Sequence, residues 1–255
     1  SNNLRTWHIN HSRQFCSNQH IFDFIHPAAA ANRQGTAARK RRIVTRVAFI
    51  NPNSTIAMTT SCARSFVAQL PKDYHVEAIT NHQAPAAIQG PKDGDAAVPG
   101  VLDIIANGKF DAYVIACFDD TGLAEARTIT QKPVIGIGQA SFHLAALSSG
   151  RFSVLTTLAV SIPVIAENIE AQGFGRVCDG VYASGVPVLD LETAPDESRG
   201  IISSHLQKMA VENPSNAVVL GCAGMTNIWN KLQPDHQITL IDPVAAAAKL
   251  IPVIA

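Results

Sequence analysis

Long apolar runs are missing from this sequence. Nowhere in its 255 residues do 18 or more apolar residues follow one another. A helix that crosses the hydrocarbon core of a bilayer needs about 20 such residues. We therefore expect no membrane-spanning segment and no membrane partner.

Disulfide, metal and nucleotide motifs are missing as well. The five cysteines are an odd number without a Cys-x-x-Cys pair, and the nine histidines form no His-Glu-x-x-His motif. Gly136-Ile-Gly138 lacks the third glycine of a dinucleotide-binding fingerprint. These absences argue against a disulfide-stabilised fold and a zinc finger. We expect a cytoplasmic protein that contains neither a metal nor another cofactor.

Charge is unevenly distributed along the chain, although the formal net charge is zero. Residues 1–46 contain eight of the 20 Lys and Arg residues and a single acid, Asp23, so the remainder has 12 basic and 19 acidic residues, a charge of −7. Nucleic-acid binding needs clustered basic side chains, and we expect none in that remainder.

The first 45 residues show no sustained helical or strand periodicity and are predicted to be a basic, disordered extension. An organelle transit peptide and a basic localisation signal at Lys40-Arg-Arg are alternatives.

From Thr45 onward, short apolar runs alternate with segments of helical spacing. This alternation predicts an α/β fold with parallel sheets and right-handed crossovers. The predicted strands are residues 46–50, 76–80, 111–117, 133–138, 152–157, 181–189 and 217–221. The predicted helices are residues 56–70, 101–107, 122–129, 141–147, 162–172, 198–211 and 244–251. Residues 84–99 contain three Pro and two Gly and are predicted to be a loop that lies over the strand ends.

The sequence also repeats itself. Cys117 and Cys222 each follow a strand-like run and are 105 positions apart, as are Asn51 and Thr156 at the ends of two other predicted strands. Such spacing indicates two copies of one α/β unit. We expect two pseudo-symmetric, Rossmann-like (flavodoxin-like) lobes, residues 46–150 and 151–255. Open α/β sheets bind ligands at the carboxyl ends of their strands, so the active site is expected in the cleft between the lobes.

Two thiols on opposite sides of one carbon can act as acid and base in a racemase. A helix N-terminus beside each thiol would lower its pKa and ready it as a base. A buried cysteine is more often a small hydrophobic residue, but the matched positions favour catalysis for Cys117 and Cys222. Cys16, Cys62 and Cys178 have no matched partner and are expected to be structural.

Five short motifs occur in order along the chain: Ile50-Asn-Pro-Asn-Ser, Ala116-Cys-Phe-Asp-Asp-Thr-Gly-Leu, Val154-Leu-Thr-Thr, Ser184-Gly-Val-Pro-Val-Leu and Leu220-Gly-Cys-Ala-Gly-Met. In these motifs the chain, from about Arg46 to Ala255, resembles the Asp/Glu racemase superfamily, and within it the hydantoin and allantoin racemases. The resemblance implies cofactor-independent racemisation of a five-membered ureide ring, a small-molecule substrate, two α/β lobes, two catalytic cysteines and a homo-oligomer.

The residues around the cysteines suggest which substrate is bound. Amino-acid racemases of this superfamily typically place Asn-Thr after the first cysteine and Thr-Glu after the second, whereas this chain has Phe118-Asp119 and Ala223-Gly224. Backbone N–H groups and apolar walls suit a neutral ring better than a zwitterion. The predicted substrate-binding residues are Asn51, Phe118, Thr156, Thr157, Ala223 and Gly224.

Alternatives remain for several of these residues. Asn51-Pro-Asn is also ordinary turn chemistry, and Thr156-Thr157 could cap a strand edge. Asp119 departs from the hydantoin-racemase pattern, which has a small residue there; it could raise the pKa of the neighbouring thiol or cap the next helix.

Three other functions remain open at this point. One is racemisation of an amino acid such as aspartate or glutamate. Another is lyase or isomerase chemistry of the arylmalonate decarboxylase or maleate isomerase kind, although the single-cysteine decarboxylases would not need both thiols. The third is small-molecule binding without catalysis, which needs neither thiol.

Overall fold

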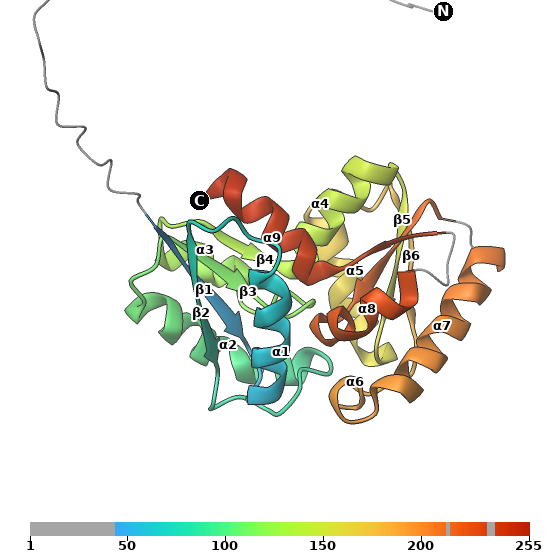
Figure 1. Cartoon of the computed structure of the whole chain (residues 1–255), viewed down its shortest axis with the longest axis horizontal. Helices are drawn as coiled ribbons and strands as arrows, with labels where there is room; N and C mark the ends of the chain where they lie inside the picture. Colours follow the sequence, from blue (N-terminus) through green and yellow to red (C-terminus); the bar gives the residue numbers. More distant parts are fainter. Residues whose placement is uncertain (1–43, 213–214, 234–237) are drawn as a thin grey trace, which may run out of the picture. The chain divides into compact units, whose positions relative to one another are not determined.

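The computed structural model describes residues 44–212, 215–233 and 238–255 (Figure 1). The predicted N-terminal extension lies outside these residues, apart from its last two positions. None of the helices within the described ranges is both long enough and apolar enough to cross a membrane.

The first half of the described chain forms a four-stranded parallel sheet with the strand order β2-β1-β3-β4. Each strand is followed by a helix, because the apolar runs that form the strands alternate with amphipathic segments. The elements are β1 (Thr45–Asn51), α1 (Ile56–Val67), β2 (Tyr74–Thr80), α2 (Pro91–Asn107), β3 (Ala112–Ile115), α3 (Leu123–Ile129), β4 (Val134–Gly136) and α4 (Ile137–Ser149).

The second half repeats this topology in a sheet with the order β6-β5-β7-β8. Its helical elements include two short 3₁₀ turns, η1 and η2. The elements are β5 (Phe152–Thr156), η1 (Ala159–Ser161), α5 (Ile162–Ala171), β6 (Cys178–Ala183), α6 (Asp190–Thr193), α7 (Pro195–Glu212), β7 (Ala217–Gly221), η2 (Ala223–Met225), α8 (Thr226–Leu232), β8 (Thr239–Ile241) and α9 (Pro243–Ile254).

The two sheets agree in register as well as in order. Ile50 of β1 lies opposite Ile115 of β3, and Leu155 of β5 lies opposite Leu220 of β7, which is the same pair displaced by 105 positions. The structure therefore confirms the predicted pair of equivalent α/β lobes with parallel sheets. The division at Gly150 itself stays a prediction.

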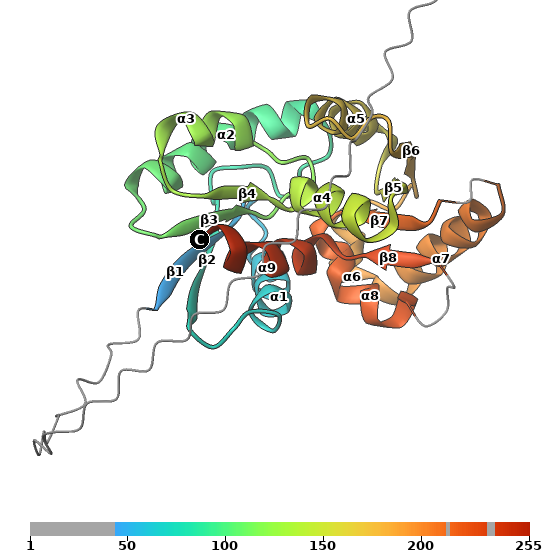
Figure 2. The same cartoon turned by 90° about the horizontal axis from the view of Figure 1, so that it is seen from above.

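Helices cover both faces of the sheets, as Figure 2 shows: α2, α3 and α5 lie on one side, and α1, α8 and α9 on the other. Helix α4 follows the first sheet in sequence but packs on β5, β7 and β8 of the second. Helix α9 follows the second sheet and contacts α1 and β4 of the first. Each lobe is therefore completed by the last helix of the other.

Aromatic side chains pack against one another between the two lobes. Phe142 of α4 stacks on Phe152 of β5, with ring centroids 5.9 Å apart, and meets Phe118 edge to face at 5.6 Å. All three side chains are buried. Phe118 directly follows Cys117, so this packing fixes the backbone that carries the first thiol.

One predicted element is wrong. Residues 84–99 are not all loop, because α2 begins at Pro91. Proline is well tolerated in the first helical turn, where its missing N–H would have no partner, and Asp93 accepts a hydrogen bond from the backbone N–H of Gln89 at 3.0 Å. Pro99 lies inside the helix, where burial of Ala97, Val101 and Ile105 compensates for the interrupted hydrogen bond.

Several element boundaries also differ from the sequence prediction. The strand predicted over residues 181–189 ends at Ala183, because Gly185 is left-handed (φ +77°) and Pro187 has no N–H. Ile137 and Gly138 begin α4 rather than ending β4, and α9 continues past Pro252.

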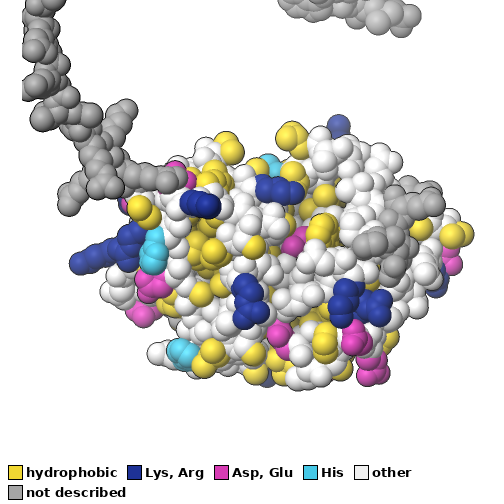
Figure 3. Space-filling view, in the orientation of Figure 1, with side chains coloured by type: hydrophobic (Ala, Val, Ile, Leu, Met, Phe, Trp, Pro, Cys, Tyr) yellow, Lys and Arg dark blue, Asp and Glu magenta, His cyan; other side chains and the backbone are white. Residues whose placement is uncertain are grey.

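On the face shown in Figure 3, Lys and Arg side chains are scattered, and acidic side chains lie among them. That the protein does not bind nucleic acid stays a prediction.

Candidate active site

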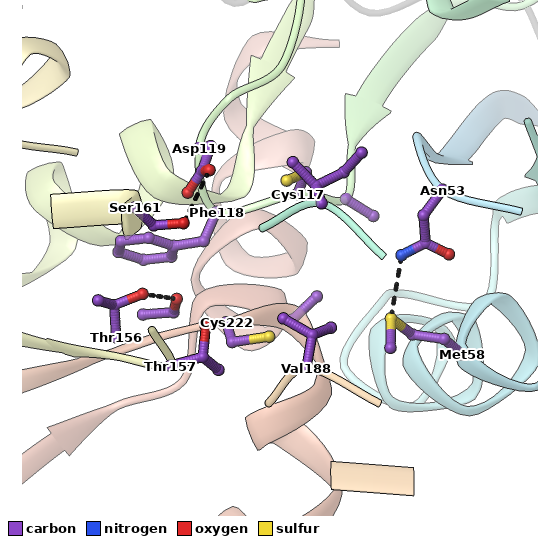
Figure 4. A pocket seen from close by; sticks show the side chains of 14 residues that line it. Asn53, Met58, Cys117, Phe118, Asp119, Thr156, Thr157, Ser161, Val188 and Cys222 are labelled. Carbon is purple, nitrogen blue, oxygen red and sulfur yellow. Dashed lines mark hydrogen bonds between the residues drawn. The ribbon is translucent and has the colours of Figure 1, made fainter. Parts of the chain in front are cut away.

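Cys117 and Cys222 line the same cavity, at the carboxyl ends of the two sheets (Figure 4). The cavity has about 370 Å³ of empty space, including the part that is open to solvent. Fourteen residues line the cavity, and each lobe contributes seven of them. Figure 4 shows the two cysteines on opposite walls, Cys117 from the first lobe and Cys222 from the second.

Cys117 sits in a tightly held turn after β3. The backbone N–H of Asp120 donates to the carbonyl of Cys117 at 3.1 Å. Asp120 has a left-handed backbone (φ +50°), and its carboxylate accepts hydrogen bonds from the N–H groups of Gly138 (2.9 Å) and Gln139 (2.8 Å). These N–H groups belong to the first turn of α4, where helical N–H groups lack partners within the helix.

The two glycines at the start of α4 make room for this turn. A Cβ at Gly136 would lie 1.9 Å from Oδ1 of Asp120, and one at Gly138 would lie 2.3 Å from the carbonyl oxygen of Phe118. Gly136-Ile-Gly138 therefore lets the Cys117 turn approach α4 closely, which explains the two glycines without any nucleotide.

Cys222 directly follows β7 and precedes η2. The backbone N–H groups of Gly224 and Met225 lie against its sulfur and lower its pKa. Behind it, the buried Cys62 of α1 donates an S–H hydrogen bond to the carbonyl of Ala223 at 3.4 Å. Cys62 thus packs against the backbone that carries Cys222 and does not line the cavity.

Both thiols have raised pKa values, contrary to the lowering expected from nearby helix N-termini. Burial raises the pKa of Cys117, and the charge of Asp119 raises it further, whereas the nearby hydroxyl of Thr121 and backbone N–H of Asp119 lower it. Burial also raises the pKa of Cys222, to about 12, with a smaller contribution from Asp119. The backbone N–H groups act in the expected direction, but desolvation of the thiolate outweighs them.

Asp119 is the third titratable group on the cavity wall. Its Oδ2 accepts a hydrogen bond from the hydroxyl of Ser161 at 3.3 Å, and its backbone carbonyl accepts one from Nδ2 of Asn168 at 2.9 Å. Burial raises the pKa of Asp119 to about 7. The residue does not cap α3, which begins after Gly122 without a side-chain cap. Of its two predicted alternatives, the structure favours the effect on the thiol pKa.

Four of the six predicted substrate-binding residues line the cavity: Phe118, Thr156, Thr157 and Ala223. The hydroxyl of Thr156 donates a hydrogen bond to the carbonyl of Gly221 at 3.0 Å. The roles of these residues in substrate binding stay predictions.

Asn51 and Gly224 do not line the cavity. The side-chain amide of Asn51 bonds to Asn53 and Thr59 inside the lobe. The Cα of Gly224 faces Leu191, which an added Cβ would approach to 3.0 Å.

Several lining residues were not named from the sequence. They are Asn53, Met58, Ile88, Ala116, Ser161, Val188 and Gly221. Asn53, Ala116, Val188 and Gly221 belong to motifs on which the resemblance rests, and Ile88 belongs to the segment expected to lie over the strand ends. Ser161 had no such signal, because it reaches the cavity through η1, which follows β5.

Among the residues that the structure describes, no cluster of three or more His, Cys, Asp or Glu side chains could hold a metal ion. The chemistry available at the cavity comes from two thiols, one carboxyl group and the surrounding hydroxyl and amide groups.

Comparison with known proteins matches residues 47–251 to the family model described as Asp/Glu/Hydantoin racemase. A hydantoin racemase of Rhizobium meliloti is 41% identical over 205 residues, which cover 79% of this chain and 85% of that protein. The structure of an allantoin racemase from Klebsiella pneumoniae superposes with a TM-score of 0.78 at 33% identity, covering 82% of this chain and 86% of that one. A glutamate racemase from Bacillus anthracis, at 17% identity and a TM-score of 0.63 over 83% of this chain and 82% of that one, shares the fold. The chain belongs to the Asp/Glu/hydantoin racemase family.

Proposed function

We propose that this protein racemises a five-membered ureide ring of the hydantoin or allantoin type, with Cys117 and Cys222 as acid and base. The observation that carries the proposal is the placement of two thiols on opposite walls of one cavity, at equivalent positions of two equivalent lobes. The names of the hydantoin and allantoin racemases to which the chain is similar support the same substrate class.

The reaction would proceed by transfer of one proton to a thiolate and delivery of another from a thiol. The ring carbon carries a C–H bond next to a carbonyl group. One cysteine, as thiolate, takes this proton, and the electron pair of the broken C–H bond moves onto the carbonyl oxygen as an enolate. The opposite cysteine, as thiol, then protonates the carbon from the other face. The two cysteines exchange roles when the other enantiomer is bound.

The raised thiol pKa values affect the two catalytic roles differently. They oppose formation of the thiolate that acts as the base, because a general base is most effective when its pKa lies near the working pH. The same high pKa keeps the second cysteine protonated, so that it can act as the acid.

The composition of the cavity favours a neutral ring over an amino acid. No Lys or Arg is among the fourteen lining residues, whereas Asp119 is. An amino-acid carboxylate would be repelled by Asp119 when that group is ionised, and it would meet apolar side chains at Phe118 and Ala223. A hydantoin ring carries no full charge and offers N–H groups that a carboxylate accepts.

Polarimetry of the purified protein tests the proposal directly. We expect loss of optical rotation with enantiopure allantoin or with 5-substituted hydantoins, and no change with aspartate or glutamate. Racemisation of amino acids alone would favour the amino-acid racemase, release of CO₂ from an arylmalonate would favour the decarboxylase, and binding without any change would favour a non-catalytic role. Activity that persists after EDTA treatment and dialysis would support a cofactor-independent reaction.

The resemblance to the family also leads us to propose a homo-oligomer. Size-exclusion chromatography with light scattering measures this independently of activity.

A further inference from the structure

The turn that joins β1 to α1 presents an amide group to the cavity. It contains Asn51 and Asn53, both buried, with 2% and 5% of their surfaces exposed. Only Asn53 lines the cavity. The two side chains are linked to each other and to the first residues of α1, so the turn is held by side-chain as well as backbone hydrogen bonds.

The orientation of the Asn53 amide follows from its partners. Its Oδ1 accepts hydrogen bonds from the backbone N–H of Thr55 at 2.9 Å and from Nδ2 of Asn51 at 2.8 Å. A backbone N–H can only donate, so the atom facing Thr55 must be the oxygen. The NH₂ group must then point the other way, and Figure 4 shows the nitrogen of Asn53 on the cavity side and its oxygen turned away.

The NH₂ group of Asn53 has a weak partner. It donates a hydrogen bond to the thioether sulfur of Met58, at 3.2 Å. A thioether is a weak acceptor, so a carbonyl oxygen that entered the cavity would be a better partner for this N–H. The donor is therefore oriented before a ligand arrives and is not committed to a strong acceptor.

Two of the three hydroxyl groups on the wall already donate to protein acceptors. The hydroxyl of Thr156 donates to the carbonyl of Gly221, and the hydroxyl of Ser161 donates to Asp119. The third hydroxyl, that of Thr157, can rotate, whereas the hydrogen bonds of the Asn53 oxygen fix the direction of its NH₂ group. Asn53 is therefore the donor whose orientation is set before a substrate binds.

We propose that Nδ2 of Asn53 donates a hydrogen bond to the substrate carbonyl oxygen on which the enolate charge develops, and that Asn51 is a positioning residue for it. This inference rests on the proposed racemase function and adds the group that stabilises its intermediate. As the C–H bond breaks and its proton passes to a thiolate, the carbonyl oxygen gains charge and the hydrogen bond from Asn53 strengthens. Reprotonation of carbon by the opposite thiol returns the electron pair to the C–H bond.

Asn51 has no free group to offer a ligand. Its Nδ2 lies within hydrogen-bond distance of Asn53, Thr55 and Thr59, and its Oδ1 accepts from the backbone N–H of Asn53 at 3.2 Å. It therefore acts on the reaction only through the placement of Asn53.

The test compares kcat and KM for the wild type with those for Asn53→Ala and Asn53→Asp, using the ring compound that the wild type racemises fastest. Asn53→Asp keeps the oxygen that Thr55 and Asn51 bind but removes the NH₂ group. It therefore tests the loss of the donor while the hydrogen bonds that hold the turn are kept. Removal of one preorganised donor to an oxyanion typically costs about 10²–10³-fold in kcat. We expect a loss of that order in both variants, with KM changed only a few-fold. Asn51→Ala should give a smaller loss in kcat, because Thr55 still holds the Asn53 amide.

Asn107→Ala is the matched control, because Asn107 is exposed at the far end of α2, with its side chain bonded to Asp103. It should retain wild-type kcat, and thermal unfolding of each variant checks that the fold is kept. The proposal is overturned if folded Asn53→Asp retains its kcat, or if its whole loss is a rise in KM. A wild-type protein that racemises no ring compound overturns the proposed function and this role together, whereas an active wild type with unaffected Asn53 variants overturns only the role of Asn53.

Discussion

The hydroxyl of Ser161 donates a hydrogen bond of 3.3 Å to the carboxyl group of Asp119, and so joins η1 of the second lobe to the turn after Cys117 in the first. This contact places a carboxyl group beside the cavity that both thiols line. The charge of Asp119 raises the pKa of each thiol. The carboxyl group thereby couples the ionisation of the two cysteines to its own.

Replacement of Asp119 by Asn should move the pH dependence of racemisation. The proposed reaction requires one thiolate, so activity should rise as pH passes through the pKa of the reacting thiol. Loss of the Asp119 charge lowers that pKa, and the rising limb of kcat/KM should shift to lower pH. A full pH profile measures the shift.

Asp103→Asn provides the control, since Asp103 is an exposed acid at the far end of α2 and its loss should leave the profile in place. The coupling between Asp119 and the thiols would be contradicted if the rising limb of kcat/KM in Asp119→Asn stayed at the wild-type pH or moved to higher pH.

Replacement of Asp120 by Ala should destabilise the protein. Its carboxylate binds the N–H groups of Gly138 and Gln139, and removal of the acceptor leaves both without this partner at the buried end of α4. The cost of a buried unsatisfied donor is about 1–3 kcal/mol. Urea denaturation should show a lower midpoint for Asp120→Ala and a smaller decrease for Asp120→Asn, which keeps one acceptor oxygen. An Ala variant as stable as the wild type would show that these hydrogen bonds do not hold the turn.

Deletion of residues 1–44 should leave folding and activity unchanged. The first strand begins at Thr45, the family match begins at residue 47, and the cavity is lined by residues between Asn53 and Ala223. Circular dichroism and the racemisation rate of the shortened protein measure the outcome. Insoluble or inactive protein would show that the N-terminal segment contributes to the core or to the site.

The sequence was sufficient to predict the fold because its signals are local and repeated. Strand-like runs end at Asn51 and Thr156 as predicted, and the shared offset of 105 positions identifies the equivalent strands. The start of α2 was missed because Pro91 and Pro99 suggested a loop, although proline fits the first turn of a helix and burial of one helix face can outweigh a second proline.

The sequence predicts which strand ends form the site, but it does not predict which side chains of the following turns face the cavity. Both cysteines reach the cavity, as their positions after β3 and β7 implied. The sequence indicated Asn51 because spacing identifies where a strand ends, whereas the hydrogen bonds of the following turn place Asn53 at the cavity. The direction of the thiol pKa shifts also depends on burial, which results from packing of both lobes and is not visible in a local motif.

The central claim is that Cys117 and Cys222 are the opposed acid and base, and hydrogen exchange in deuterated water tests it most directly. Replacement of either cysteine by Ser retains the side-chain shape but supplies a much weaker acid and base, so racemisation should fall on the order of 10²–10⁴-fold in both variants. Each variant keeps one working thiol and should still exchange the ring C–H of the enantiomer that presents its hydrogen to that thiol. We therefore predict opposite enantiomer preferences for exchange in Cys117→Ser and Cys222→Ser. Full racemase activity in either variant, or the same preference in both, would contradict the two-cysteine mechanism.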